Sequence, residues 1–169
     1  MTRKSLEHLN CSWAQAAEAI GDKWSIMIVR DAFFGVKTFS AFADNLGISK
    51  NILTQRLEHL IKHGVLAKRP IGLGTSRSEY TLTDKGQALF PIMIGLAQWS
   101  DEWVFGNDKE PYNIIDKQKG APIQKVRVTD TNGCELSMAD VTLTPGKGAN
   151  ANNRRLAEEM ARNERLADG

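Results

Sequence analysis

The sequence has few of the residues that cross-link a small protein or bind a metal ion. Among its 169 residues there are two cysteines and three histidines. Cys11 and Cys134 lie far apart in sequence and do not make a disulfide framework, so in a reducing compartment we expect both to be thiols. No Cys-x-x-Cys pair accompanies Cys134, and the histidines are scattered. We therefore expect neither a metal site nor a cofactor.

Long apolar runs are also absent. No stretch approaches the roughly 20 apolar residues that span a bilayer, and the polar start of the chain, residues 1–5, lacks the apolar core of a signal peptide. These features predict a cytoplasmic protein without a membrane partner. Hydrophobic residues make up 41% of the chain and charged residues 25%, which is typical of a soluble protein with one core of about 100 residues and an appendage.

The sequence lacks the motifs that would indicate an enzyme. It contains no P-loop, no dinucleotide-binding fingerprint, no nucleophile elbow and no histidine-glutamate zinc motif. Asp22 and Asp31 are nine residues apart across a predicted helix and show no sign of forming a catalytic carboxylate pair. We therefore predict that the protein is not an enzyme.

The chain is organised around residues 38–62. Their apolar side chains recur at helical spacing on both sides of Gly47, which predicts two short amphipathic helices joined by a tight turn, a helix-turn-helix. Ser49 follows the turn and is a good N-cap, because its hydroxyl can accept a hydrogen bond from an unpaired backbone N–H. The second helix is therefore expected to begin near Lys50.

One face of this second helix is polar. Helical spacing turns four apolar residues inward: Leu53, Leu57, Leu60 and Ile61. The outward side chains are slim and rich in amides and hydroxyls, which suit base edges in the major groove of DNA. An ordinary solvent-facing helix is the competing interpretation. The outward residues are Lys50, Asn51, Thr54, Gln55 and Glu58.

Two strands are predicted after this helix, at residues 66–71 and 78–82, around a flexible tip at 72–76. Together they form a β-hairpin wing. From Lys50 to Arg77 there are six basic residues and one acidic residue, a net charge of +5, whereas the whole chain carries +2. Positive charge that clusters on a helix-turn-helix with a wing indicates DNA binding.

An ordered series of residues over about 10–103 is more specific than any of its parts. It reads Cys11, Gly21-Asp22-Lys23-Trp24, Phe39, Ile48-Ser49, Leu53-Thr54-Gln55-Arg56-Leu57, Leu60, Gly64-Val65-Leu66, Arg69, Tyr80-Thr81-Leu82-Thr83 and Gly86. This series resembles the HxlR family of bacterial winged-helix transcription regulators, relatives of the MarR group. The resemblance implies a mostly α-helical fold with a small β wing (α+β). It also implies a dimeric regulator of nearby genes, which we expect to be a repressor with a small-molecule or electrophile signal.

The expected DNA-binding residues fall into three groups by their chemistry. Arg56 adjoins the inward-facing Leu57, so a pair with an acid such as Asp44 is its alternative. His59 and His63, four residues apart, can in principle hold a metal, but we expect them to be solvated or phosphate-facing. Lys50, Asn51, Thr54 and Gln55 are expected to read bases, Ser49, Arg56, Lys62, Lys68 and Arg69 to hold phosphates, and Arg77 to enter or border the minor groove.

Cys11 has two competing roles. It lies just before a predicted helix at 12–20, where unpaired backbone N–H groups can stabilise a thiolate. The resemblance implies that this cysteine senses oxidants or electrophiles, modified alone or in a disulfide across the dimer. The alternative is a small buried residue or a helix cap. As a sensor, it would move the first helix against the dimer interface and so change DNA affinity.

The remaining helices suggest a homodimer. Residues 24–34 form a helix that is hydrophobic nearly all round and is expected in the core. A long helix at 83–104, predicted to kink at Pro91, has more apolar surface than one small domain covers. We expect the dimer interface on this helix and the first one. A two-fold dimer places its recognition helices about 34 Å apart and favours a palindromic operator in double-stranded DNA.

We divide the sequence into three parts: a winged helix-turn-helix and dimerisation domain at 1–105, a linker at 106–122, and an extension at 123–169. The extension is predicted to contain strands at 123–129 and 134–136 around an Asn132-Gly133 turn, a third strand at 141–143, and a helix at 153–166. So small a sheet needs the rest of the chain, or a partner, to cover it.

The competing function is a winged-helix adaptor that binds proteins and not DNA. An adaptor has no need to keep its recognition face basic, which argues against it here. A steep fall of DNA affinity with salt would distinguish the regulator from the adaptor.

Overall fold

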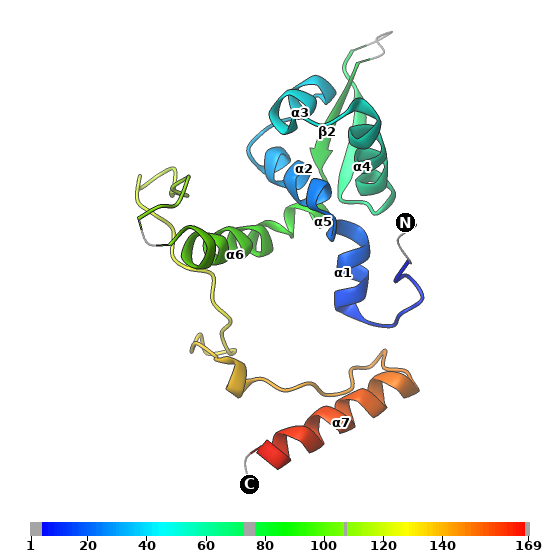
Figure 1. The fold of residues 1–169 in the computed structure, drawn as a ribbon, viewed down its shortest axis with the longest axis vertical. Coiled ribbons are helices and arrows are strands. Elements are labelled where there is room, and N and C mark those ends of the chain that lie inside the picture. The colour runs from blue at the N-terminus through cyan, green and yellow to red at the C-terminus, as the bar shows by residue number, and fades with distance from the viewer. Residues whose placement is uncertain (1–4, 73–76, 107, 168–169) are drawn as a thin grey trace. The chain divides into compact units, whose positions relative to one another are not determined.

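The computed structural model describes residues 5–72, 77–106 and 108–167 (Figure 1). The chain forms two compact units, one of Ala19–Val126 and one of Met1–Glu18 with Arg127–Gly169. The division predicted from the sequence, at residues 105 and 122, stays a prediction. Along the chain lie α1 (Ser12–Ile20), α2 (Lys23–Phe33), α3 (Phe39–Leu46), α4 (Lys50–Lys62), β1 (Leu66–Pro70), β2 (Ser78–Leu82), α5 (Asp84–Gln87), α6 (Phe90–Ser100), the π-helix η1 (Asp101–Phe105), the 3₁₀ turn η2 (Met138–Asp140) and α7 (Ala151–Ala167).

The core of the first unit lies among α2, α3, α4 and the two strands (Figure 1). The inward side chains of α4 are buried as its periodicity predicts, and Ile61 packs against the same core. The mostly helical fold with a small two-stranded sheet confirms the predicted class. Nine residues form the buried centre: Ile28, Val29, Phe42, Leu53, Leu57, Leu60, Val65, Leu66 and Tyr80.

Helices α3 and α4 both begin with a side-chain cap. Thr38 accepts a hydrogen bond from the Ala41 N–H at the start of α3, and Ser49 accepts one from the Ile52 N–H at the start of α4. Each cap satisfies a backbone donor that has no partner within its helix. Gly47 closes the turn between these helices with φ of 61°, in the left-handed region that favours glycine. The predicted helix-turn-helix is therefore confirmed.

The wing is an antiparallel pair in which Lys68 lies opposite Tyr80. The Tyr80 N–H donates to the Lys37 carbonyl over 2.8 Å, and Thr38 forms an isolated bridge with Glu79. These contacts attach β2 to the link between α2 and α3. The predicted tip at 72–76 falls mostly outside the described residues.

The long helix predicted at 83–104 is interrupted. Helix α5 ends at Gln87, and α6 begins at Phe90 with Pro91 in its first turn. Proline tolerates this position because the first N–H groups of a helix lack partners, whereas inside a helix its ring would clash with the carbonyl of Gln87, four residues back. Pro91 therefore starts a helix and does not kink one. At the other end, the Gly106 N–H bonds to the Asp101 carbonyl, which gives the π-turn of η1.

Residues 106–126 fold back onto α6. The side-chain amide of Gln98 donates to the Gln124 carbonyl over 3.0 Å and accepts from the Val126 N–H over 2.8 Å. Lys125 pairs with Glu102 at 2.7 Å. Gln124, Lys125 and Val126 lie at the start of the predicted extension, so its first residues pack on α6 within the first unit.

The second unit contains the predicted terminal helix as α7, but the predicted strands are reduced. Thr129 and Glu135 form an isolated bridge around the Asn132-Gly133 turn, and the structure assigns no strand within 108–167. Asn10 and Asn153 exchange hydrogen bonds, one from each side-chain amide, both of 2.7 Å. These bonds fasten the residue before Cys11 to the start of α7. Across the described ranges, no helix has the length and apolarity that a bilayer crossing requires.

Candidate nucleic-acid interface

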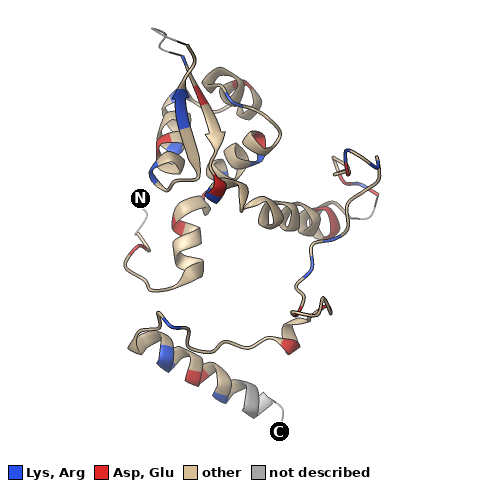
Figure 2. Cartoon of the chain, turned by 180° about the vertical axis from the view of Figure 1, so that it is seen from behind, with Lys and Arg blue, Asp and Glu red and all other residues tan. Residues whose placement is uncertain are grey.

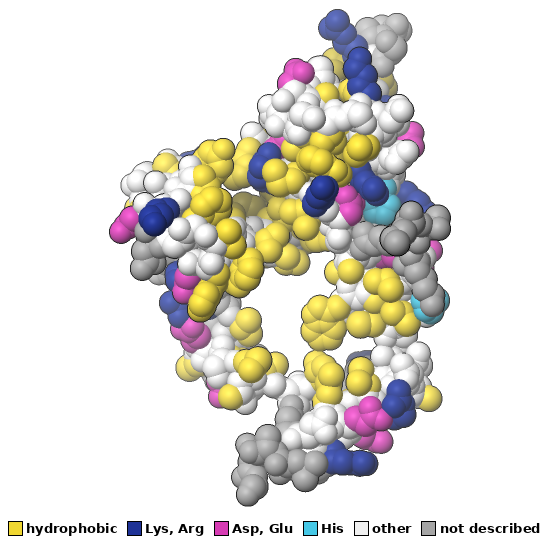
Figure 3. Space-filling view, in the orientation of Figure 1, with side chains coloured by type: hydrophobic (Ala, Val, Ile, Leu, Met, Phe, Trp, Pro, Cys, Tyr) yellow, Lys and Arg dark blue, Asp and Glu magenta, His cyan; other side chains and the backbone are white. Residues whose placement is uncertain are grey.

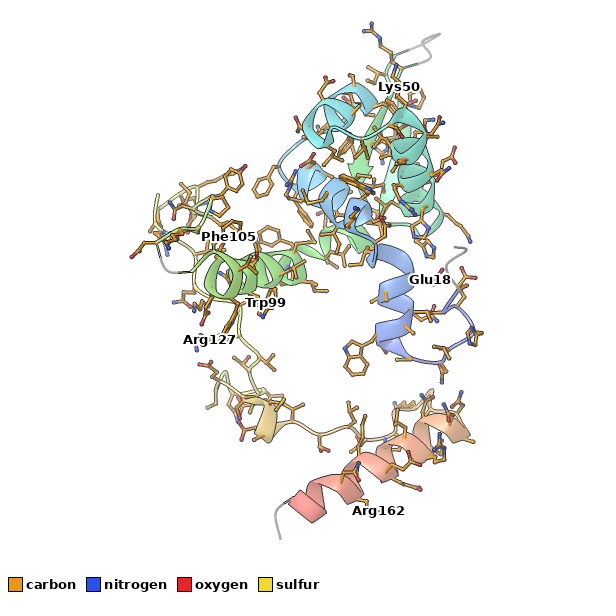
Figure 4. All side chains as sticks on the ribbon, viewed as in Figure 1. Glu18, Lys50, Trp99, Phe105, Arg127 and Arg162 are labelled. Atoms are coloured by element: carbon orange, nitrogen blue, oxygen red, sulfur yellow. The ribbon has the colours of Figure 1, made fainter. Side chains whose placement is uncertain are left out.

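The outer face of α4 carries the residues predicted to read bases. The side chains of Lys50, Asn51, Thr54 and Gln55 are exposed, as is that of Glu58. Lys50 begins the helix (Figure 4), beside the positive end of the helix dipole. Ser49 is exposed and uses its hydroxyl oxygen as an acceptor for the helix, which leaves its O–H free to donate to an anion. This face can therefore offer amide, hydroxyl and ammonium groups to a ligand.

Arg56 differs from the other predicted residues. Its Nε lies 3.4 Å from an Oδ1 of Asp22, the residue that caps α2, and its side chain is only partly exposed. The predicted alternative, a pair with an acid, is therefore what forms, although the acid is Asp22 and not Asp44. Arg56 joins α4 to the start of α2.

Sequence reasoning gave Asp22 no role in the site. Its carboxylate accepts hydrogen bonds from the Trp24 N–H, the Ser25 N–H and the Ser25 hydroxyl, and Ser25 is fully buried. Burial would raise the pKa of Asp22, but the Ser25 hydrogen bonds, the positive charge of Arg56 and the Trp24 N–H together lower it below 3.8. An Asp just before a predicted helix, three residues ahead of a Ser, is the signal that could have found this N-cap.

The wing adds basic side chains. Lys68 and Arg69 on β1 are exposed, as is Arg77 just before β2, and Figure 2 shows basic residues on both α4 and the wing. The Lys68 ammonium lies 5.9 Å from the centre of the Tyr80 ring, within cation–π range. Lys62 is exposed at the end of α4. The helix and the wing therefore present the positive charge that the sequence concentrates between Lys50 and Arg77.

His59 and Asp31, which could suggest metal binding or catalysis, contact other groups of the protein. The His59 ring lies 4.4 Å from that of His63, centre to centre, and its Nε2 lies 3.2 Å from the Ala19 carbonyl. The buried carboxylate of Asp31 pairs with Arg30 at 2.6 Å. Among the residues that the structure describes, no three potential ligands gather into a metal site.

Cys11 lies at the start of α1, where its carbonyl accepts the hydrogen bond from the Gln15 N–H. Its side chain is half-buried, and both Cys11 and Cys134 are free thiols. Cys11 therefore lies directly before α1, and its sensing role stays a prediction.

An apolar stripe runs along α6 into η1. Figure 3 shows hydrophobic side chains gathered over α6. Ile92, Leu96, Trp99 and Trp103 recur at spacings of four, three and four, so they share one helical face, and Trp103 is 71% exposed. On α1, Trp13 is 70% exposed. Exposed apolar surface of this kind marks an interaction site.

Comparison with known proteins agrees with this arrangement. The family model described as HxlR-like helix-turn-helix matches residues 19–108. An HTH-type transcriptional regulator of Mycobacterium tuberculosis (strain ATCC 25618 / H37Rv) is 34% identical over 140 residues, which cover 83% of this chain and 89% of that protein. Both matches include the helix-turn-helix and the wing.

Two solved structures extend the comparison. The crystal structure of PA1607, described as a transcription factor, is 36% identical with a TM-score of 0.79, and the match covers 85% of this chain and 100% of that one. Such coverage reaches well beyond residue 108. The redox regulator HypR in its oxidized form is 26% identical with a TM-score of 0.50, over 54% of this chain and 95% of that one. Because the family model matches more than half of the chain and a relative of similar length is 34% identical, this chain belongs to the HxlR-like helix-turn-helix family of transcriptional regulators.

Proposed function

We propose that the protein is a dimeric, sequence-specific DNA-binding repressor that reads a palindromic operator. The observation that carries this proposal is the exposed polar face of α4 beside a basic wing. In a winged helix-turn-helix, such a helix enters the major groove while the surrounding basic groups contact phosphates. A regulator of this kind acts on DNA in the cytoplasm.

Within this proposal the residues have separate roles. Lys50, Asn51, Thr54 and Gln55 read base edges, because they are exposed on the free face of α4. Arg56 supports α4 through Asp22, so we give it a smaller share of phosphate binding than the sequence suggested. The phosphate contacts come from Ser49, Lys62, Lys68 and Arg69, with Arg77 at the minor groove.

The dimer forms, in this proposal, through the apolar stripe of α6 and the first helix. Water-exposed tryptophans cost free energy in a lone protomer, and a two-fold partner would cover them. Two copies of α4 would then meet successive major grooves on one DNA face, about 34 Å apart.

The test is the affinity of the full-length protein for DNA from upstream of its own gene, measured by fluorescence anisotropy at several salt concentrations. Log affinity should fall with log salt by about 0.9 for each phosphate neutralised. Gln55→Ala should cost about 1–3 kcal/mol on operator DNA and little on random DNA, because a bidentate base contact is lost.

Gln118→Ala is the matched control, since Gln118 is an exposed glutamine on the 106–126 segment. It should bind both DNAs as the wild type does. If Gln55→Ala lost the same affinity for operator and random DNA, Gln55 would not read bases. If DNA affinity did not depend on salt, the adaptor function would be favoured instead.

We further propose that Cys11 is the signal-sensing thiol, supported by its place at the start of α1 and by the 26% identity with a redox regulator. A two-electron oxidant would convert the Cys11 thiolate to a sulfenic acid. Alternatively, it would join the Cys11 thiols of two protomers in a disulfide, with two electrons passing to the oxidant and two protons released.

Oxidation should change operator affinity by fivefold or more in the wild type and in Cys134→Ser, but not in Cys11→Ser. Cys134 is the matched control, because it is the other thiol of the same unit and is exposed. If oxidation still changed operator affinity in Cys11→Ser, a group other than Cys11 would be the sensor.

A further inference from the structure

A surface-open cavity of about 420 Å³ lies in the first unit, between α2, β2, the end of α5 and the start of α6. This volume falls within the range of about 300–1,000 Å³ that small-molecule sites occupy. None of the proposed DNA-binding residues lines it. The proposed function therefore leaves this cavity without a role.

One wall of the cavity is aromatic. The rings of Phe33 and Phe90 lie 5.4 Å apart, centre to centre, with an interplanar angle of 57°. Phe90 is 48% exposed, so part of its surface remains available to a ligand. Ala32 and Leu82 continue the apolar lining. A planar ring fits such a wall, because tilted aromatic contacts over about 4.5–7 Å are favourable.

The charged part of the cavity lining comes from Lys37. Lys37 is the one charged residue among the described residues that line the cavity, and neither Asp nor Glu is among them. Within the described part of the chain, the Lys37 ammonium has no ion pair, whereas its backbone carbonyl is held by the Tyr80 N–H. The Thr81 hydroxyl and the Gln87 amide add neutral hydrogen-bonding groups. An uncompensated cation beside apolar walls favours an organic anion.

We propose that this cavity is a binding site for a small aromatic carboxylate, with its ring against Phe33 and Phe90 and its carboxylate on Lys37. A bound ring would touch three elements at once: the link from α2 to α3, the wing strand β2, and the start of α6. Ligand binding would therefore bias the position of the wing and the helix-turn-helix relative to α6. This coupling to DNA rests on the proposed function, whereas the binding site itself does not.

The binding test uses the full-length protein and two probes of similar shape, 2-naphthoate and the neutral 2-naphthalenemethanol, titrated calorimetrically without DNA. Lys37→Met keeps the side-chain length and the backbone carbonyl that holds Tyr80, and it should weaken 2-naphthoate about tenfold while changing the alcohol less than twofold. Ala32→Trp fills the cavity and should abolish binding of both probes. Lys23→Met, at the start of α2 and away from the cavity, should match the wild type.

Equal 2-naphthoate affinity in the wild type and Lys37→Met, or no binding at all, would overturn the site. Lys37→Met keeps the test decisive if Ala32→Trp fails to fold. A loss of dimer mass in Ala32→Trp by sedimentation would show that a second copy fills the cavity, which would also overturn the proposal. For the coupling, 2-naphthoate should shift operator affinity fivefold or more in the wild type and not in Lys37→Met. Binding without such a shift would overturn the coupling alone.

Discussion

Arg56 shows how one contact decides the role of a charged residue. It lies on the helix proposed to read DNA, yet its guanidinium turns toward Asp22, whose carboxylate also caps α2 and binds the buried Ser25. An ion pair that is only partly exposed is worth more than a surface pair, since the protein screens it less than water does. Asp22 therefore fixes the start of α2 and the middle of α4 together.

The Asp22 contact predicts the effect of Asp22→Asn. Asparagine keeps the carbonyl oxygen that caps α2, but it loses the charge that faces Arg56. We expect a loss of about 1 kcal/mol in the free energy of unfolding at pH 7. Asp22→Ala removes the cap as well and should cost about 1 kcal/mol more. Urea unfolding at several pH values measures both changes.

The pH dependence of this loss has a definite sign. The pKa of Asp22 is lower in the folded protein than its usual value of 3.8, so the unfolded chain binds the proton more tightly. The stability it provides is present in full above pH 3.8 and is lost as the pH falls through the lower, folded value. The difference in the free energy of unfolding between wild type and Asp22→Asn, which we call the gap, should therefore shrink in acid. A gap of the same size at pH 3 and pH 7 would mean that the charge is not its cause.

At the scale of elements, local patterns predict local structure well. Helices α3 and α4 and the wing follow the apolar period and the Ser49 cap, because each signal acts within a few residues. The pair of Arg56 and Asp22 leaves no such signal, since its partners are distant in sequence. The exposed face of α4 was therefore predictable, whereas the inward turn of Arg56 was not.

The C-terminal extension shows where a local pattern misleads. Residues 123–129 alternate like a strand, yet Val126 and Val128 are 47% and 64% exposed. An alternating pattern forms a sheet when one face has a core to cover. In the described part of the second unit, the pairing beside the turn is reduced to the bridge of Thr129 with Glu135. The break between α5 and α6 has a different cause: Pro91 suits the start of a helix, and the sequence alone does not show which end it occupies.

Gly86 fixes the position of α5 against the turn between α4 and β1. A Cβ at this position would meet the Val65 carbonyl oxygen at 2.2 Å, and backbone atoms cannot move aside cheaply. Thr83 binds the same turn, donating to the Gly64 carbonyl over 2.6 Å. Gly86→Ala should therefore lower the free energy of unfolding by about 2 kcal/mol or more, despite the better helix propensity of alanine. Denaturant unfolding at fixed protein concentration measures this loss.

Gly95 supplies the matched control for Gly86. It lies inside α6, and a Cβ there would make ordinary contact with Val126 at 3.8 Å. Gly95→Ala should be neutral or should stabilise the protein by up to about 1 kcal/mol. If both alanines had the same effect, the close contact of Gly86 with Val65 would not be the limiting feature.

At the scale of the whole molecule, charge and apolar surface are segregated along the chain. The segment from Lys50 to Arg77 carries +5 while the whole chain carries +2, so the rest is net negative. The apolar stripe on α6 and η1 belongs to that other part of the sequence. This separation suits a protein that binds DNA with one segment and a second copy of itself with another, because each surface can meet its partner without repelling it.

Trp99 lies in the middle of the stripe and is 57% exposed (Figure 4), so it tests this assignment. Trp99→Glu would place a charge where a partner's apolar surface must pack, and burying an unpaired charge costs several kcal/mol. The variant should sediment as a monomer at concentrations where the wild type is a dimer. It should also bind operator DNA more weakly, because two half-sites are no longer read together. Tyr112→Glu removes an aromatic side chain that is 78% exposed outside the stripe and should remain dimeric. A dimer that survives Trp99→Glu would remove the stripe from the interface and leave the first helix, where Trp13 is the next residue to replace.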